Sequence, residues 1–85
     1  MGSARELLTL AVRMSKELNV GDHDYMFRTY EFCFVGEHAV KWLMSAGYAE
    51  SIAGALALGN QMLASGIIHH VTNEHAFQNK YLFYR

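Results

Sequence analysis

The chain has 85 residues, which is enough for one folded domain and too few for a second core. Hydrophobic residues make up 52% of it and charged residues 18%, a balance that excludes intrinsic disorder. No apolar run reaches the roughly 20 residues that cross a bilayer. The formal net charge of −1 argues against a nucleic-acid-binding surface, which carries an excess of Lys and Arg.

The first predicted element is an amphipathic helix. Residues 1–3 are typical of additions made in cloning, so a single domain is expected over residues 4–85. Apolar residues then recur at helical intervals, at Leu7, Ala11, Met14 and Leu18. Asn19 and Gly21 follow and are typical of a helix end.

A β-arm is predicted next, over residues 22–35. Aromatic and β-branched residues dominate this segment and the helical period disappears. On the two faces of such a strand, Tyr25, Phe27 and Thr29 alternate with Met26, Arg28 and Tyr30, as expected for strand or hairpin material. No Asn-Gly or Asp-Gly pair marks a tight turn, so the arm is expected to be short and irregular.

Two more helices and a terminal pair of strands complete the prediction. Gly36 breaks the arm and a second helix begins at Glu37, with an inward face of Ala39, Val40, Leu43, Met44 and Gly47. Ser51 is placed to cap a third helix, whose predicted inward face comprises Ile52, Ala55, Leu56, Gly59, Met62, Leu63 and Gly66. Short strands are expected over 67–71 and 81–84. The predicted fold class is α+β.

Catalysis is not expected. Cys33 carries the only thiol of the chain, and the imidazole of His38 is close to it in the sequence. In principle, the two form a nucleophilic pair. The neighbours Phe32 and Phe34 predict an apolar setting that raises the pKa of a thiol and makes it unreactive. Cys33 is therefore interpreted as a core residue. As the only cysteine, it also favours a reducing, intracellular compartment.

No metal ion or other cofactor is expected either. His69, His70 and His75 cluster in the sequence, but adjacent strand residues point to opposite faces, so His69 and His70 do not easily share one ion. The chain lacks the cysteines of the common zinc patterns, and it has no phosphate-binding glycine motif.

The candidate binding residues lie on the arm, at Tyr25, Met26, Phe27 and Arg28. Large aromatic and Met side chains on a small domain favour a protein interface. The alternative is that these aromatics only line the seam between arm and core. Contact with a membrane surface is less favoured, because the segment 22–31 carries three carboxylates and one arginine, which anionic lipid repels.

Several motifs, in this order and spacing, resemble the DEP domain, named for Dishevelled and pleckstrin among others. They are the Thr-Tyr-x-x-Cys-Phe-x-Gly run of 29–36, the pattern of Val40, Trp42 and Leu43, the Gly-Ile-Ile before His69, and the Phe-Tyr-Arg of 83–85. The segment 66–85 is most similar to the tandem DEP modules of DEPTOR and the P-Rex Rac exchangers. The resemblance implies a three-helix bundle with a β-hairpin arm between helices one and two, a short C-terminal β-hairpin and a winged-helix-like shape.

The resemblance also implies a function without catalysis. DEP domains recruit larger signalling proteins, such as GTPase or kinase-pathway regulators, to membrane-anchored partners, receptor tails or acidic lipids. The implied location is the cytoplasm, with peripheral contact at the plasma membrane. This sequence departs from the family before Thr29, where a basic pair is usual and Asp22, His23 and Asp24 stand instead. That departure favours a protein partner over lipid.

Three other hypotheses remain open at this point. A winged-helix-like nucleic-acid-binding domain would use the third helix, but residues 51–65 contain no Arg or Lys. The domain could instead pack against a neighbouring domain of the same chain. An arm of this kind could also exchange between two copies and form a swapped dimer.

Overall fold

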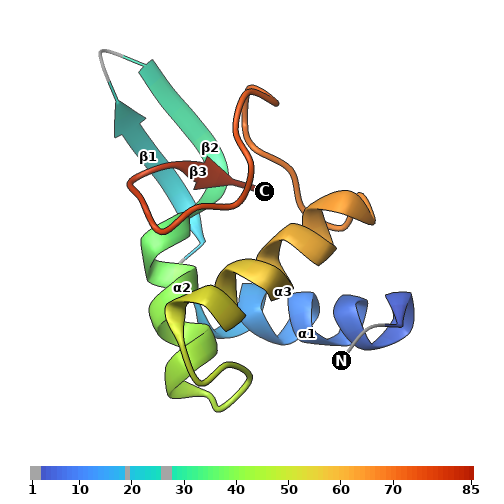
Figure 1. Ribbon diagram of the computed structural model, residues 1–85. Helices are drawn as coiled ribbons and strands as arrows, with labels where there is room; N and C mark the ends of the chain where they lie inside the picture. Colours follow the sequence, from blue (N-terminus) through green and yellow to red (C-terminus); the bar gives the residue numbers. More distant parts are fainter. Residues whose placement is uncertain (1–2, 19, 26–27) are drawn as a thin grey trace.

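The computed structural model describes residues 3–18, 20–25 and 28–85. Within them it places three helices and a small antiparallel sheet (Figure 1). The elements in chain order are α1 (Ala4–Glu17), β1 (Gly21–Tyr25), β2 (Arg28–Val35), α2 (Gly36–Ser45), α3 (Ile52–Ala64) and β3 (Phe83–Tyr84). The predicted α+β class, with the arm between the first two helices, is confirmed.

Helix α1 forms where the apolar period predicted it. Ser3 caps it, because its hydroxyl oxygen accepts a hydrogen bond from the Glu6 backbone N–H at 3.1 Å. The buried face comprises Leu7, Leu10 and Met14. The chain becomes extended at Leu18, which ends the helix.

Helices α2 and α3 also follow their predicted caps and breaks. Ser51 caps α3 by accepting from the Gly54 backbone N–H at 3.1 Å. Helix α2 begins at Gly36, where a Cβ atom would lie 2.5 Å from the carbonyl oxygen of Gln78, so only glycine fits. Four residues expected inside lie outside: Met44 is 37% exposed, Ile52 is 48% exposed, and Gly47 and Gly66 are exposed as well.

The arm is a two-stranded antiparallel hairpin of β1 and β2. Across it His23 pairs with Tyr30, Asp24 with Thr29, and Tyr25 with Arg28. The register shifts between Gly21 and His23, so two residues of β2 oppose one of β1 in a β-bulge. Phe32 lies in this bulge with φ of +50°, and its N–H donates to the Asp22 carboxylate at 3.2 Å.

The last strand joins the arm to the body. Strand β3 pairs with the inner end of β2, through Phe34 with Tyr84 and Val35 with Phe83. The predicted C-terminal hairpin is present in a shortened form. It consists of an antiparallel bridge between His70 and Tyr84, flanked by two backbone hydrogen bonds between His69 and Arg85.

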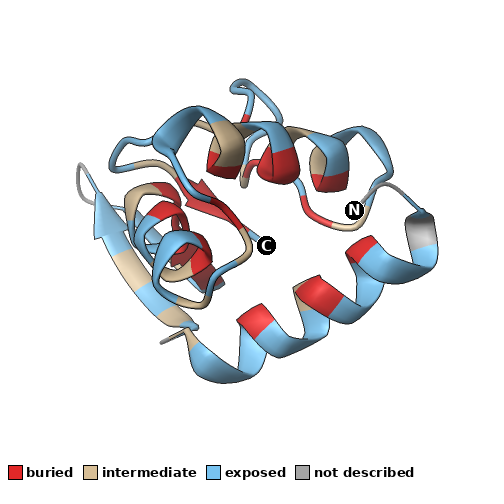
Figure 2. Cartoon of the chain, turned by 60° about the horizontal axis from the view of Figure 1, so that its bottom comes forward, coloured by how far each residue is buried: buried red, intermediate tan, exposed pale blue. Residues whose placement is uncertain are grey.

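The core lies between the three helices and the base of the sheet. Figure 2 shows the buried residues on the sides of the helices that face one another. Trp42 is half-buried against this core, and its ring stacks on Tyr48 with centroids 5.6 Å apart. A smaller cluster of Cys33, Val35 and Phe83 fills the junction of arm and body. The backbone pairing of the arm with the rest of the domain is therefore confined to its base.

Candidate functional site: a cleft between the arm and the C-terminal segment

The two faces of the arm differ in chemistry. Residues paired across an antiparallel ladder share a face, and alternate residues along a strand share it too. One face therefore carries His23, Tyr25, Arg28 and Tyr30. The opposite face carries exposed Asp24, whose carboxylate accepts from the Thr29 hydroxyl at 2.6 Å. The arm is thus aromatic on one side and acidic on the other.

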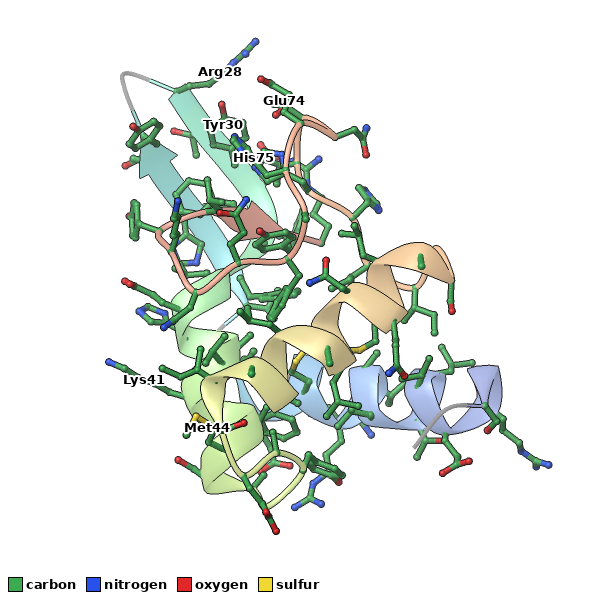
Figure 3. The ribbon with its side chains drawn as sticks, in the orientation of Figure 1. Arg28, Tyr30, Lys41, Met44, Glu74 and His75 are labelled. Carbon is green, nitrogen blue, oxygen red and sulfur yellow. The ribbon has the colours of Figure 1, made fainter. Side chains whose placement is uncertain are left out.

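The aromatic face of the arm forms one wall of a cleft of about 260 Å³. The other wall is the segment 70–83, which runs beside the arm in Figure 3. The arm contributes Tyr25 and Tyr30, and the segment 70–83 contributes His70, Val71, Thr72, Glu74, His75, Tyr81, Leu82 and Phe83. Tyr30, Glu74 and His75 all line the cleft, and their labelled side chains lie close together in the view of Figure 3.

Four rings form a continuous aromatic surface in the cleft. Tyr30 packs against Phe83 with centroids 5.5 Å apart, and Phe83 against Tyr81 at 5.1 Å in a T-shaped contact. Tyr81 in turn lies 6.4 Å from Tyr25. Tyr25 is 52% exposed and Tyr81 49% exposed, so about half of each residue remains open to solvent. Such exposed aromatic surface is typical of binding sites.

His70 is the buried polar residue of the cleft. Its Nδ1 accepts from the backbone N–H groups of Thr72 and Glu74, each at 3.3 Å, so this nitrogen carries no proton and Nε2 does. Burial lowers the pKa of His70, and the neighbouring His75, whose ring meets it edge-on at 4.8 Å, lowers it further. His70 therefore acts as a neutral acceptor that shapes the turn around Glu74.

Helix α3 positions this wall from behind. The side-chain amide of Asn60 both donates to the carbonyl of Phe77 at 3.1 Å and accepts from its N–H at 3.0 Å. The Phe77 ring lies on Gly59 and packs against Tyr84 at 5.2 Å. The Tyr84 hydroxyl donates to the carbonyl of Ala76 at 2.5 Å, and burial raises its pKa. The segment 70–78 is thus fixed to the core.

The sequence-predicted site residues are only partly placed. Tyr25 lines the cleft, and Arg28 lies on the same face at the outer end of the arm. Met26 and Phe27 lie outside the described residues. Sequence reasoning missed Glu74 and Tyr81, and it left Tyr30 of the arm out of the candidate set. The available signal was the two-residue spacing of Tyr81 and Phe83, which places both rings on one side of an extended segment.

The other candidate chemistries find no support from geometry. Cys33 is fully buried, its thiol donates to the Tyr30 carbonyl at 3.3 Å, and burial raises its pKa, while His38 is exposed. Cys33 is thus a core residue, as predicted. His69 is exposed and His70 buried, in agreement with opposite strand faces. Among the described residues, no three potential metal ligands lie together, and no helix is both long and apolar enough for a membrane span.

A second hollow, of about 320 Å³, lies between α1 and the base of the arm. Its lining is almost entirely apolar and includes Leu8, Val12, Val20 and Phe32, all partly exposed. Phe32 is 75% exposed, so its ring stands out beside the bulge. The helical pattern of α1 did not reveal this hollow, because Leu8 and Val12 lie off the predicted inward face.

Comparison with known proteins agrees with this arrangement. The family model "Domain found in Dishevelled, Egl-10, and Pleckstrin (DEP)" matches residues 17–85. The phosphatidylinositol 3,4,5-trisphosphate-dependent Rac exchanger 1 protein of Mus musculus is 37% identical over 73 residues, which cover 85% of this chain and 4% of the exchanger. The similarity to Rac exchangers predicted from the segment 66–85 is thereby confirmed.

A fungal relative and a solved structure extend the comparison. The vacuolar membrane-associated protein IML1 of Eremothecium gossypii is 31% identical over 84 residues, which cover 94% of this chain and 6% of that protein. This chain thus spans about 4–6% of the length of these relatives. The solution structure of the human pleckstrin DEP domain matches 91% of this chain and 97% of its own with a TM-score of 0.65, at 16% identity. The chain belongs to the DEP family.

Proposed function

We propose that this DEP domain is a non-catalytic docking module of a larger intracellular signalling protein. It recruits that protein to a membrane-associated protein partner, or it packs against a neighbouring domain of the same chain. The family occurs in signalling proteins, among them the Rac exchangers. For the parent chain we propose a regulatory activity such as guanine-nucleotide exchange, in the cytoplasm and at the periphery of the plasma membrane.

The observation that carries this proposal is the open aromatic cleft beside the arm. Tyr25 and Tyr81 are each about half exposed there, although the helices and the base of the sheet enclose a separate core. Arg28 lies at the outer end of the same face. Aromatic residues and arginine are the side chains most enriched among those that dominate binding energy. Tyr25, Met26, Phe27 and Arg28 remain the proposed partner-binding residues.

The acidic side of the arm supports a protein partner over lipid. Asp22, Asp24 and Glu31 are all exposed and fall on or beside the face opposite the aromatic rings. An anionic membrane surface attracts basic segments at about 1 kcal/mol for each Lys or Arg and repels carboxylates. Membrane recruitment by this domain is therefore proposed to run through a protein.

The proposal is tested with the full-length parent chain in cells, by measuring the fraction at the plasma membrane. Arg28→Ala and Tyr25→Ser are expected to lower that fraction, because both side chains lie on the aromatic face of the arm. Lys41→Ala and Ile52→Ser are the matched controls. They remove an exposed cation on α2 and an exposed apolar group on α3, and neither residue lines the cleft. Figure 3 labels Lys41 on α2.

The control pair also decides how the result is interpreted. If all four variants recruit as well as the wild type, the cleft does not dock the partner. If Lys41→Ala and Ile52→Ser lose recruitment while the arm variants keep it, the interface lies on the helices instead. Replacing Met26 and Phe27 by serine extends the test to the other two proposed partner-binding residues. Those variants should lose recruitment without losing the fold.

A further inference from the structure

The walls of the cleft are electron-rich. Three tyrosine rings and Phe83 surround it, and the face of an aromatic ring attracts a cation that lies within about 6 Å of its centroid. Because Tyr25, Tyr30 and Tyr81 come from both walls, a group that enters between arm and loop meets rings on two sides.

One carboxylate stands at the entrance. Glu74 is exposed on the loop and lines the cleft opposite Tyr30 (Figure 3). In the part of the chain that the structure describes, the one ion pair joins Arg13 and Glu17 on α1, so no described cation neutralises Glu74. The Glu74 side chain is therefore available to an incoming positive charge.

The floor of the cleft adds no opposing charge. The Nδ1 of His70 is held as an acceptor by two backbone N–H groups, which keeps its ring neutral. His75 meets the His70 ring edge-on. The side chain of Arg28 extends beyond the outer end of the arm in Figure 3, away from the floor. The interior thus combines aromatic faces with a single carboxylate.

The size of the cleft suits one long side chain. Its volume of about 260 Å³ lies below the roughly 300–1,000 Å³ of sites that hold drug-sized ligands. We propose that the cleft binds a single lysine or arginine side chain from a basic, extended segment of the partner protein. This inference rests on the proposed docking role of the cleft and adds that the docked side chain is positively charged.

The acidic face of the arm favours the same partner. Asp22, Asp24 and Glu31 provide a negative field close to the cleft, which attracts a basic segment and disfavours an anionic one. A zwitterionic lipid headgroup also carries a cation, but it sits in a membrane surface that offers no further positive charge to these carboxylates. The partner that these charges favour is therefore a basic protein segment.

The test is an NMR titration of this domain with three short Gly-Ser peptides that carry one central lysine, norleucine or glutamate. Norleucine keeps the aliphatic length of lysine and lacks its charge. The lysine peptide is expected to shift the resonances of Tyr25, Glu74 and Tyr81, and the other two peptides are not. Glu74→Gln should weaken lysine binding about three-fold, as for an exposed ion pair. Tyr81→Leu should weaken it by a similar factor, about three-fold.

Controls and outcomes separate this inference from the docking role itself. Glu50→Gln removes an exposed carboxylate on the loop between α2 and α3 and should leave lysine binding unchanged. Equal weakening by Glu50→Gln and Glu74→Gln, or stronger binding of the norleucine or glutamate peptide, overturns the inference. Binding to neutral phosphatidylcholine vesicles in place of the peptide overturns it as well. If recruitment depends on Tyr25 and Arg28 while the lysine peptide does not bind, the docking role stands and the cation site is refuted.

Discussion

The absence of a side chain at Gly59 of α3 leaves room for the Phe77 ring behind the cleft. The substitution Gly59→Ala tests how much the domain depends on this close packing. A Cβ atom at Gly59 would overlap three carbons of the Phe77 ring, which is 1% exposed and has no room to retreat. Replacing glycine by alanine inside a helix gains about 1 kcal/mol from propensity. Overpacking a core costs about 1–3 kcal/mol, and the depth of this overlap places Gly59→Ala at or above the upper end. The net effect is a destabilisation of about 2 kcal/mol.

Gly54 in the same helix is the matched control. A Cβ there meets its nearest atoms, on Ser51 and Ala49, at 3.4 and 3.6 Å, which is ordinary contact. Gly54→Ala is therefore expected to stabilise the domain by up to about 1 kcal/mol. Thermal unfolding measures the contrast, because about 1 kcal/mol shifts the Tm of a domain of this size by about 4–8 °C. The two variants should differ by about 12 °C or more.

The reasoning fails if Gly59→Ala unfolds at or above the wild-type temperature. A double variant locates the cause, since Phe77→Leu removes part of the ring that the new methyl group meets. Gly59→Ala should cost less in the Phe77→Leu background than in the wild type, by about 1 kcal/mol or more. Additive costs would show that the destabilisation arises elsewhere. The Gly59→Ala domain should also lose the cleft resonance shifts with the lysine peptide.

Three further predictions concern other parts of the molecule. Folding lowers the pKa of His70 below its ordinary value of 6.5, so the unfolded chain binds more protons than the folded one. The contribution of His70 to the free energy of unfolding should therefore be fully present above about pH 6.5. It should fall as the pH drops toward the folded-state pKa. His70→Asn keeps a hydrogen-bond acceptor for the turn and should reduce the change of the free energy of unfolding between pH 5 and 7, as measured by denaturant titration. If the variant shows the same pH dependence as the wild type, the dependence arises from another group. Phe32→Gly should stabilise the domain by about 0.5–1 kcal/mol, because glycine adopts the φ of +50° at this position without strain and Phe32 is 75% exposed. Phe32→Ala keeps the strain and should not stabilise the domain. Equal unfolding midpoints for the two variants would contradict this reasoning. In a gel-shift assay the domain should not retard duplex DNA, because α3 carries no Lys or Arg to contact phosphate, and salt-sensitive retardation would restore the nucleic-acid hypothesis.

Local patterns predicted the helices well, because both their periods and their caps are local. Ser51 and Gly66 delimit α3 as expected, and Ala55, Gly59 and Met62 are buried. The exposure of Met44 and Ile52 was not predicted, since an apolar residue near a helix end meets the core only if a neighbouring element covers it. Periodicity contains no information about that neighbour.

The cleft could be predicted only in part, because its walls meet through long-range pairing. Tyr25 was identified from its place on an aromatic arm, but Tyr81 faces it only because β3 pairs with the inner end of β2. That pairing involves two residue pairs and leaves no local signature. Glu74 is a similar case, since the turn that presents it depends on the buried Nδ1 of His70.

The pairing of β2 with β3 has a consequence for the newly made chain. The wall that contains Phe83 is synthesised 53 residues after Tyr30 (83 minus 30), which takes about 3 to 10 s at 5–20 residues per second. Until Phe83 and Tyr84 pair with Val35 and Phe34, the inner face of the arm has no cover. A nascent domain therefore displays the arm as bare aromatic surface before any binding cleft exists. During that interval the exposed rings and the unpaired edge of β2 are surfaces of the kind that favour aggregation.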